Sequence, residues 1–110
     1  MNSIQNIIIK ELTIIGYDIT HSGTRYLVEI INNIYDKNLV NCINLEKDIY
    51  PLLAKKYRKS PSAIKASIDY ATTLMYFKCD ANRLMKYFNF YNDKYKPTTK
   101  TVIYTVLNKI

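Results

Sequence analysis

Apolar residues recur every three or four positions along most of the chain, which is the spacing of one face of an α-helix. This periodicity predicts five helices, over about Ile4–Ile15, Tyr26–Tyr35, Leu45–Tyr57, Pro61–Phe77 and Ala81–Phe88. In the fourth helix it predicts an inward face made of Ile64, Ile68, Ala71 or Thr72, and Met75.

A sixth apolar stretch, Val102–Ile110, has the same helical spacing, and Thr98 or Thr99 can cap a helix there. Its run TVIYTV is rich in β-branched residues, which would also suit a strand in a wing hairpin. We favour the helix because of the spacing. The fold class that follows is all-α, a compact bundle of about six helices.

Glycine and proline mark the ends of several of these helices. Gly16 suits the left-handed conformation that ends a helix, so the first helix should stop at Ile15. Pro51 falls inside the third helix, where we expect a short lead-in turn and a kink, the alternative being that the main body of the helix starts there. Ser60 before Pro61 is a strong start signal, because the serine oxygen can accept an N–H and proline needs no donor at the first helical position.

Composition supports one compact domain covering residues 1–110. The sequence is 48% hydrophobic, with only 2 Gly and 3 Pro, which is too apolar for a disordered chain and too poor in turn formers for a many-stranded sandwich. A chain of this size can bury roughly two-thirds of the surface that it exposes when unfolded.

The charge points to a polyanion as the partner. Sixteen Lys and Arg against nine Asp and Glu give a net charge of +7. Nucleic acid is the first expectation and a membrane surface the second, while the alternative is that the excess only keeps a small protein soluble. The sequence lacks a basic leader and an apolar run of about 18 residues, so we expect a cytoplasmic protein without a membrane partner.

Candidate chemistry is sparse, and we expect neither an enzyme nor a cofactor or metal site. Cys42 and Cys79 lie far apart without a CxxC pattern, which favours reduced, buried thiols. The single histidine, His21, has no obvious nucleophile as a partner. The aromatic residues after position 86 could stack on single-stranded nucleic acid, but packing explains them better.

The segment AKKYRKSPSAIKASIDYATTLMYFK favours a helix-turn-helix, the alternative being an ordinary helical hairpin with a solvated basic corner. In such a motif the second helix enters the major groove by its N-terminal half. The expected base-reading residues are Ser62, Lys65, Ala66 and Asp69. The expected phosphate-binding residues are Lys55, Lys56, Arg58, Lys59 and Ser60, with Thr98 and Lys100 as weaker candidates.

From Gly16 to Ile110 the chain resembles the C-terminal DNA-binding effector domain of the master sporulation response regulator, stage-zero sporulation protein A. The matching residues are Gly23 with YL-E-I, the segment IYP-LAKKY with its proline inside a helix, Ser62, Ile68 and Ala71, and the late KPT. The resemblance implies six helices with a central helix-turn-helix, and binding to short repeated boxes in promoter DNA, commonly by two copies in tandem.

Two departures from the family matter for function. The resemblance implies that the family reads bases with an acidic residue and two arginines, where this chain has Lys65, Ala66 and Asp69. Family proteins also carry a phosphorylated N-terminal receiver domain, and none fits before Gly16. We therefore expect a stand-alone DNA-binding regulator, without a receiver domain, that reads a different sequence.

Two other functions stay open at this point. One is a protein-interaction module that modulates a sporulation regulator or the transcription machinery, and the other is a mobile-element protein that organises DNA through backbone charge alone. A homodimer is also possible, and its expected apolar surface comprises Tyr87, Phe88 and Phe90.

Overall fold

The computed structural model describes residues 3–37, 44–78, 81–88 and 96–110. It contains six α-helices and one π-helical turn, and no strand occurs in these four ranges. The elements are α1 (Ser3–Ile15), α2 (Ser22–Lys37), η1 (Leu45–Ile49), α3 (Tyr50–Tyr57), α4 (Pro61–Lys78), α5 (Ala81–Phe88) and α6 (Thr99–Leu107). The all-α prediction is therefore confirmed, and the last apolar stretch is a helix.

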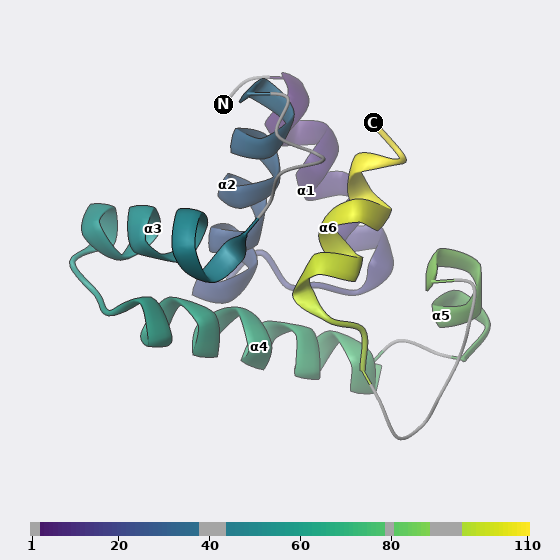
Figure 1. The fold of residues 1–110 in the computed structure, drawn as a ribbon. Helices are drawn as coiled ribbons and strands as arrows, with labels where there is room; N and C mark the ends of the chain where they lie inside the picture. Colours follow the sequence, from purple (N-terminus) through teal and green to yellow (C-terminus); the bar gives the residue numbers. More distant parts are fainter. Residues whose placement is uncertain (1–2, 38–43, 79–80, 89–95) are drawn as a thin grey trace.

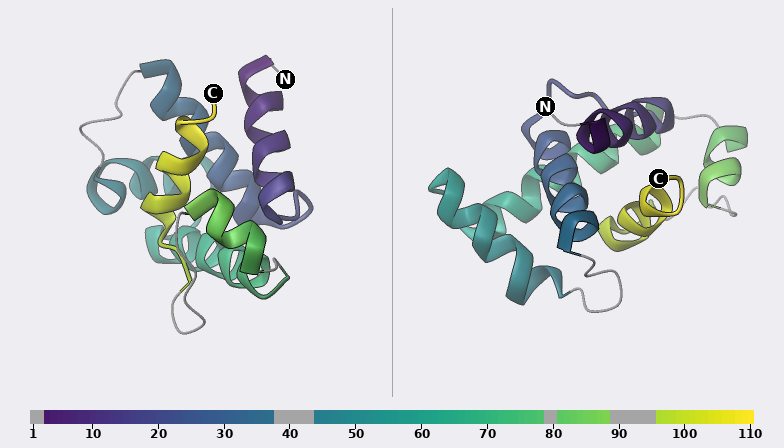
Figure 2. Two further views of the ribbon diagram at one scale, coloured as in Figure 1. Left: turned by 90° about the vertical axis from the view of Figure 1, so that its right-hand side faces the viewer. Right: turned by 90° about the horizontal axis from the view of Figure 1, so that it is seen from above.

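The helices enclose one hydrophobic core, and α2 lies at its centre. Figure 1 shows α1, α2 and α6 side by side above α4, with α3 on the left. The two turned views in Figure 2 keep the same arrangement, with α5 beside α6. The apolar residues predicted for the second helix, Tyr26, Leu27, Ile30, Ile31 and Ile34, are all buried.

The close packing of α2 on α4 depends on a glycine. A Cβ atom at Gly23 would lie 1.9 Å from the backbone oxygen of Ser67, far inside any allowed contact. Beside this crossing, the buried hydroxyl of Tyr17 forms a hydrogen bond of 2.8 Å with Oγ1 of Thr72. Burial raises the pKa of Tyr17.

The third helix differs from the sequence-based expectation in its buried face. A lead-in turn is present, but it is π-helical, capped by the Asn44 side chain, and the α-helix begins at Tyr50 with Pro51 in its first turn. A π-turn holds more residues than an α-turn and so rotates the helix face. The apolar spacing of the sequence predicts a buried face made of Leu45, Ile49, Leu52, Leu53 and Tyr57. Instead Tyr50 and Ala54 are buried, whereas Leu52 is 58% exposed.

None of the helices in the described ranges is long and apolar enough to cross a membrane. The described residues contain no cluster of His, Cys, Asp and Glu placed to hold a metal ion. Cys42 and Cys79 lie outside the described residues.

Candidate DNA-binding surface

Helices α3 and α4 are joined by a tight turn of the kind expected for a helix-turn-helix. Helix α3 ends at Tyr57, and the cap residue Arg58 adopts the left-handed conformation (φ 55°, ψ 47°) and donates its N–H to the carbonyl of Ala54. The next N–H, from Lys59, also reaches Ala54 at 2.9 Å. Helix α4 then starts at Pro61, and the side-chain oxygen of Ser60 accepts from the N–H of Ala63 at 3.1 Å. The Ser60–Pro61 start predicted from sequence is confirmed.

Helix α4 has one covered side and one uncovered side. The side chains expected to face inward, Ile64, Ile68, Ala71, Thr72 and Met75, are all buried. In Figure 1 and in the left view of Figure 2, α4 runs along the lower part of the molecule, so its lower side faces away from the other helices. An exposed helix side of this kind can enter a major groove.

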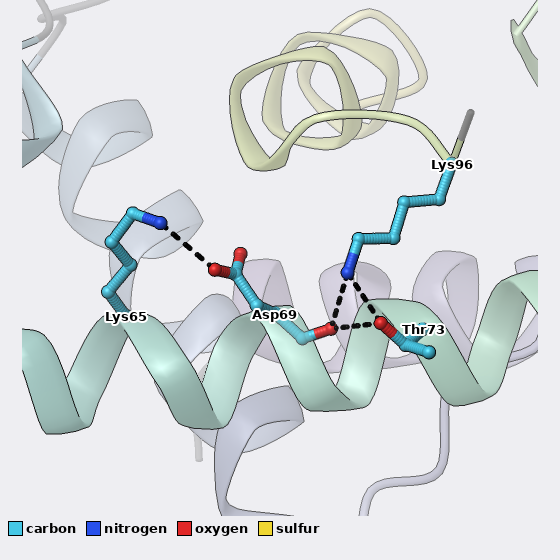
Figure 3. A network of polar contacts seen from close by, with 4 residues as sticks. All are labelled: Lys65, Asp69, Thr73 and Lys96. Carbon is cyan, nitrogen blue, oxygen red and sulfur yellow. Dashed lines mark hydrogen bonds and ion pairs between the residues drawn. The ribbon is translucent and has the colours of Figure 1, made fainter.

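The four expected base-reading residues all reach solvent, but two of them bind each other. Lys65 and Asp69 form an ion pair of 3.0 Å one helical turn apart, with their side chains 49% and 41% exposed (Figure 3). The hydrogen bond to Asp69 raises the pKa of Lys65. Ser62 bonds the hydroxyl of Ser60 at 3.2 Å, and Ala66 is exposed. At the centre of this helix, therefore, the two charges largely cancel.

A lysine that the sequence did not mark as a site residue also reaches α4. Lys96, in the segment before α6, donates through Nζ to the Oγ1 of Thr73 and to the backbone oxygen of Asp69 at 3.4 Å (Figure 3). The KPT segment supported the resemblance, but no local pattern indicated that it lies against the second helix of the motif.

The start of α6 and the ion pair of α4 border the same hollow. This hollow has a volume of about 330 Å³, and charged residues from three elements line it: Glu46, Lys65, Asp69, Lys96 and Lys100. Thr98, which also lines it, caps α6 by accepting from the N–H of Thr101 at 3.2 Å. The fold thus places the weaker phosphate candidates, Thr98 and Lys100, beside the expected base readers.

The basic corner between α3 and α4 consists of Lys55, Lys56, Arg58 and Lys59. Only Lys56 forms an ion pair within the described residues. Lys55, Arg58 and Lys59 are exposed, and no ion pair holds any of them among the described residues. Lys56 instead pairs with Glu29 of α2, which also accepts from the hydroxyl of Tyr57. The hydrogen bond to Glu29 raises the pKa of Lys56. Of the four cations expected at this corner, three are therefore exposed and held by no ion pair within the described residues.

The expected dimer surface needs a correction. Phe88 is only 6% exposed, because α5 turns it into the core, and Tyr87 is partly buried against the core. Phe90 lies outside the described residues. The apolar side chains that do project include Phe77, which is 79% exposed, Leu52, which is 58% exposed, and Met85, which is 54% exposed.

Tyr70 is a further exposed residue that the sequence-based expectation missed. It is 61% exposed and follows Ala66 by four positions, so the two share a side of α4. A complete helical wheel drawn from the sequence would have placed it there.

One family model matches this chain, over residues 8–110, and its description is "Sporulation initiation factor Spo0A C terminal". The match spans nearly all the helices described above, including α3, the turn and α4. The domains of this family are DNA-binding effector domains of transcription regulators and not catalysts. The chain therefore belongs to the family of sporulation initiation factor C-terminal domains.

Proposed function

We propose that this chain is a sequence-specific double-stranded DNA-binding protein and a transcription regulator whose base readout differs from that of its family. The observation that carries the proposal is the α3–turn–α4 unit, in which Ser62, Lys65, Ala66 and Asp69 of α4 reach solvent beside an exposed basic corner. The fold needed to place a helix in a groove is retained, while the side chains that would meet the bases have changed.

The changed side chains alter which bases can be read. Ala66 cannot make the two-pronged hydrogen bond of an arginine to guanine, a contact worth about 1–3 kcal/mol of discrimination, but its methyl group can touch that of thymine. Lys65 can donate to guanine O6 or N7, and Asp69 can accept from cytosine N4. We expect this combination to select a site other than the family's box.

Phosphate binding would come from the residues around this reading helix. Lys55, Arg58 and Lys59 are exposed at the turn, and Thr98 and Lys100 at the start of α6. Lys56 would first have to leave Glu29, so we expect it to contribute less than its neighbours. Binding by two copies in tandem, or as a homodimer, is part of the proposal, because the family commonly binds repeated boxes.

The experiment that tests this is selection from a random duplex library at roughly physiological salt, followed by titration of the selected duplex against a scrambled one. The proposal expects a recovered motif that is bound at least about 10³ times more tightly than the scrambled duplex. Changing Lys65, Ala66 and Asp69 together should alter the motif. If that triple variant selects the same motif with the same affinity, the assignment of the base readers is wrong.

A protein-interaction module remains the second candidate. It is favoured by the exposed Phe77 and Met85, since large apolar side chains at the surface are typical of interfaces with other proteins. The same titration separates the candidates, because this module would show no salt-dependent affinity for DNA. A protein that only organises DNA would bind without a motif, and its affinity would fall steeply with salt.

A further inference from the structure

A second basic surface flanks α4 on the side away from the Lys65–Asp69 ion pair. It is a hollow of about 550 Å³ between the start of α2 and the middle of α4. The residues that line it are Thr20, His21, Ser22, Gly23, Arg25, Ala66, Ser67 and Tyr70. None of the described residues lining it is acidic, whereas Glu46 and Asp69 line the hollow on the α6 side.

Arg25 carries the permanent charge of this surface. Its side chain is exposed, and its one described hydrogen bond runs from a guanidinium nitrogen to the backbone oxygen of Thr20 at 3.2 Å. A guanidinium has five N–H donors, so most of them make no hydrogen bond within the described residues. Arginine is the side chain best suited to phosphate oxygens because its donors form a planar fork.

The two carboxylates nearest to Arg25 in the chain are already bound to other groups. Glu29, one turn along α2, accepts from Lys56 and from the hydroxyl of Tyr57. Asp18 accepts from the backbone N–H of Thr20 at 2.9 Å and from its hydroxyl at 2.7 Å. Arg25 forms no ion pair among the described residues, so its guanidinium is available to a partner. It also lines a neighbouring hollow with Glu29 and Lys56, where the lysine offsets the charge of the glutamate.

We propose that Arg25 binds a backbone phosphate of duplex DNA at the edge of the groove that α4 enters, opposite the edge expected for Thr98 and Lys100. This proposal rests on the proposed function. Of the three α4 residues that line the hollow, Ala66 and Ser67 have short side chains, which leaves room for a sugar-phosphate strand beside Tyr70. The contact is to the backbone, so it strengthens binding to every sequence equally.

The test compares Arg25→Gln with Lys37→Gln. Lys37 is exposed at the other end of the same helix, about 18 Å away along the axis, so its variant is matched in charge. Affinities for the selected and scrambled duplexes are measured by fluorescence anisotropy over a range of salt concentrations. Thermal melting followed by circular dichroism confirms that both variants fold.

Arg25→Gln should weaken binding to both duplexes by the same factor, roughly three- to tenfold at low salt, and lower the slope of log affinity against log salt by about 0.9. Lys37→Gln should stay within about twofold of the wild type, and Arg25→Lys should keep the slope. If Arg25→Gln behaves like Lys37→Gln, or changes only the preference between duplexes, the phosphate contact is refuted while the proposed function stands. If the wild type binds no duplex, the proposed function and this contact fail together.

Discussion

Replacing Gly23 by alanine tests the most demanding contact in the fold. The added Cβ would lie 1.9 Å from the carbonyl oxygen of Ser67 and 2.9 Å from the backbone nitrogen of Ile68. The first of these distances falls about 1.5 Å short of the 3.4 Å at which ordinary van der Waals contact begins. Both obstacles are backbone atoms, so no side-chain rotation can relieve them, and α2 and α4 must move apart.

The expected cost follows from this movement. Overpacking a tight interior usually costs about 1–3 kcal/mol, and we expect the upper end because the fully buried Leu27 and Ile68 lie at this crossing. Alanine forms helix better than glycine, which offsets up to about 1 kcal/mol. The free energy of unfolding should therefore fall by about 2 kcal/mol or more, out of a total of about 5–15 kcal/mol for such a domain.

Urea unfolding followed by far-ultraviolet circular dichroism measures this change, and the midpoint should drop at an unchanged slope. Ser22→Ala is the control, since Ser22 precedes Gly23 in α2 and already carries a Cβ; it should stay within about 0.5 kcal/mol of the wild type. Shortening Ser67 to glycine should not rescue Gly23→Ala, because the clash is with the carbonyl. A Gly23→Ala protein as stable as the wild type would refute the argument.

Three further changes test other parts of the structure. Arg58→Gly should leave the free energy of unfolding unchanged or raise it by up to about 1 kcal/mol, because glycine adopts the left-handed conformation without strain. Its affinity for DNA should fall because a positive charge is lost. Urea unfolding measures the first effect and DNA titration the second. Tyr17→Phe leaves the buried Thr72 hydroxyl without its partner and should cost about 1–2 kcal/mol at neutral pH. Because the folded-state pKa of Tyr17 is raised, Tyr17 should contribute its whole stabilisation below about pH 10 and lose it as the pH rises further. In unfolding experiments at a series of pH values, the free energy of unfolding of Tyr17→Phe should lack this alkaline decrease. Asp69→Asn releases Lys65 and removes a negative charge, so affinity for a scrambled duplex should rise and its salt slope steepen; an unchanged slope would show that Asp69 lies away from the DNA.

The helices were predictable because their signals are local. Ser60 followed by Pro61 marks a helix start whatever the rest of the chain does, and the structure begins α4 there. Gly16 takes a positive φ of 130° at the end of α1, as expected for a helix-ending glycine. The buried face of α3 could not be predicted in this way, because the π-turn before Tyr50 changes the phase of the apolar pattern.

The candidate site shows the same division between local and tertiary information. The pairing of Lys65 with Asp69 follows from their spacing of four residues and could have been predicted. The contact of Lys96 with Asp69 joins residues 27 positions apart, and it depends on how the segment before α6 lies against α4. The position of Arg25 beside α4 likewise depends on the crossing at Gly23.

Under the proposed function, the Lys65–Asp69 pair would let a helix with few base-reading residues select a sequence. A solvent-exposed ion pair is worth only about 0–1 kcal/mol, so opening it costs little. A base pair that offers an acceptor to Lys65 and a donor to Asp69, as G·C does in the major groove, would replace the ion pair by two hydrogen bonds and so offset the free energy lost by opening it. A base pair that satisfies only one of the two leaves the other charge without a partner at the interface. Discrimination would then come from the penalty at wrong sites as much as from contacts at the right one.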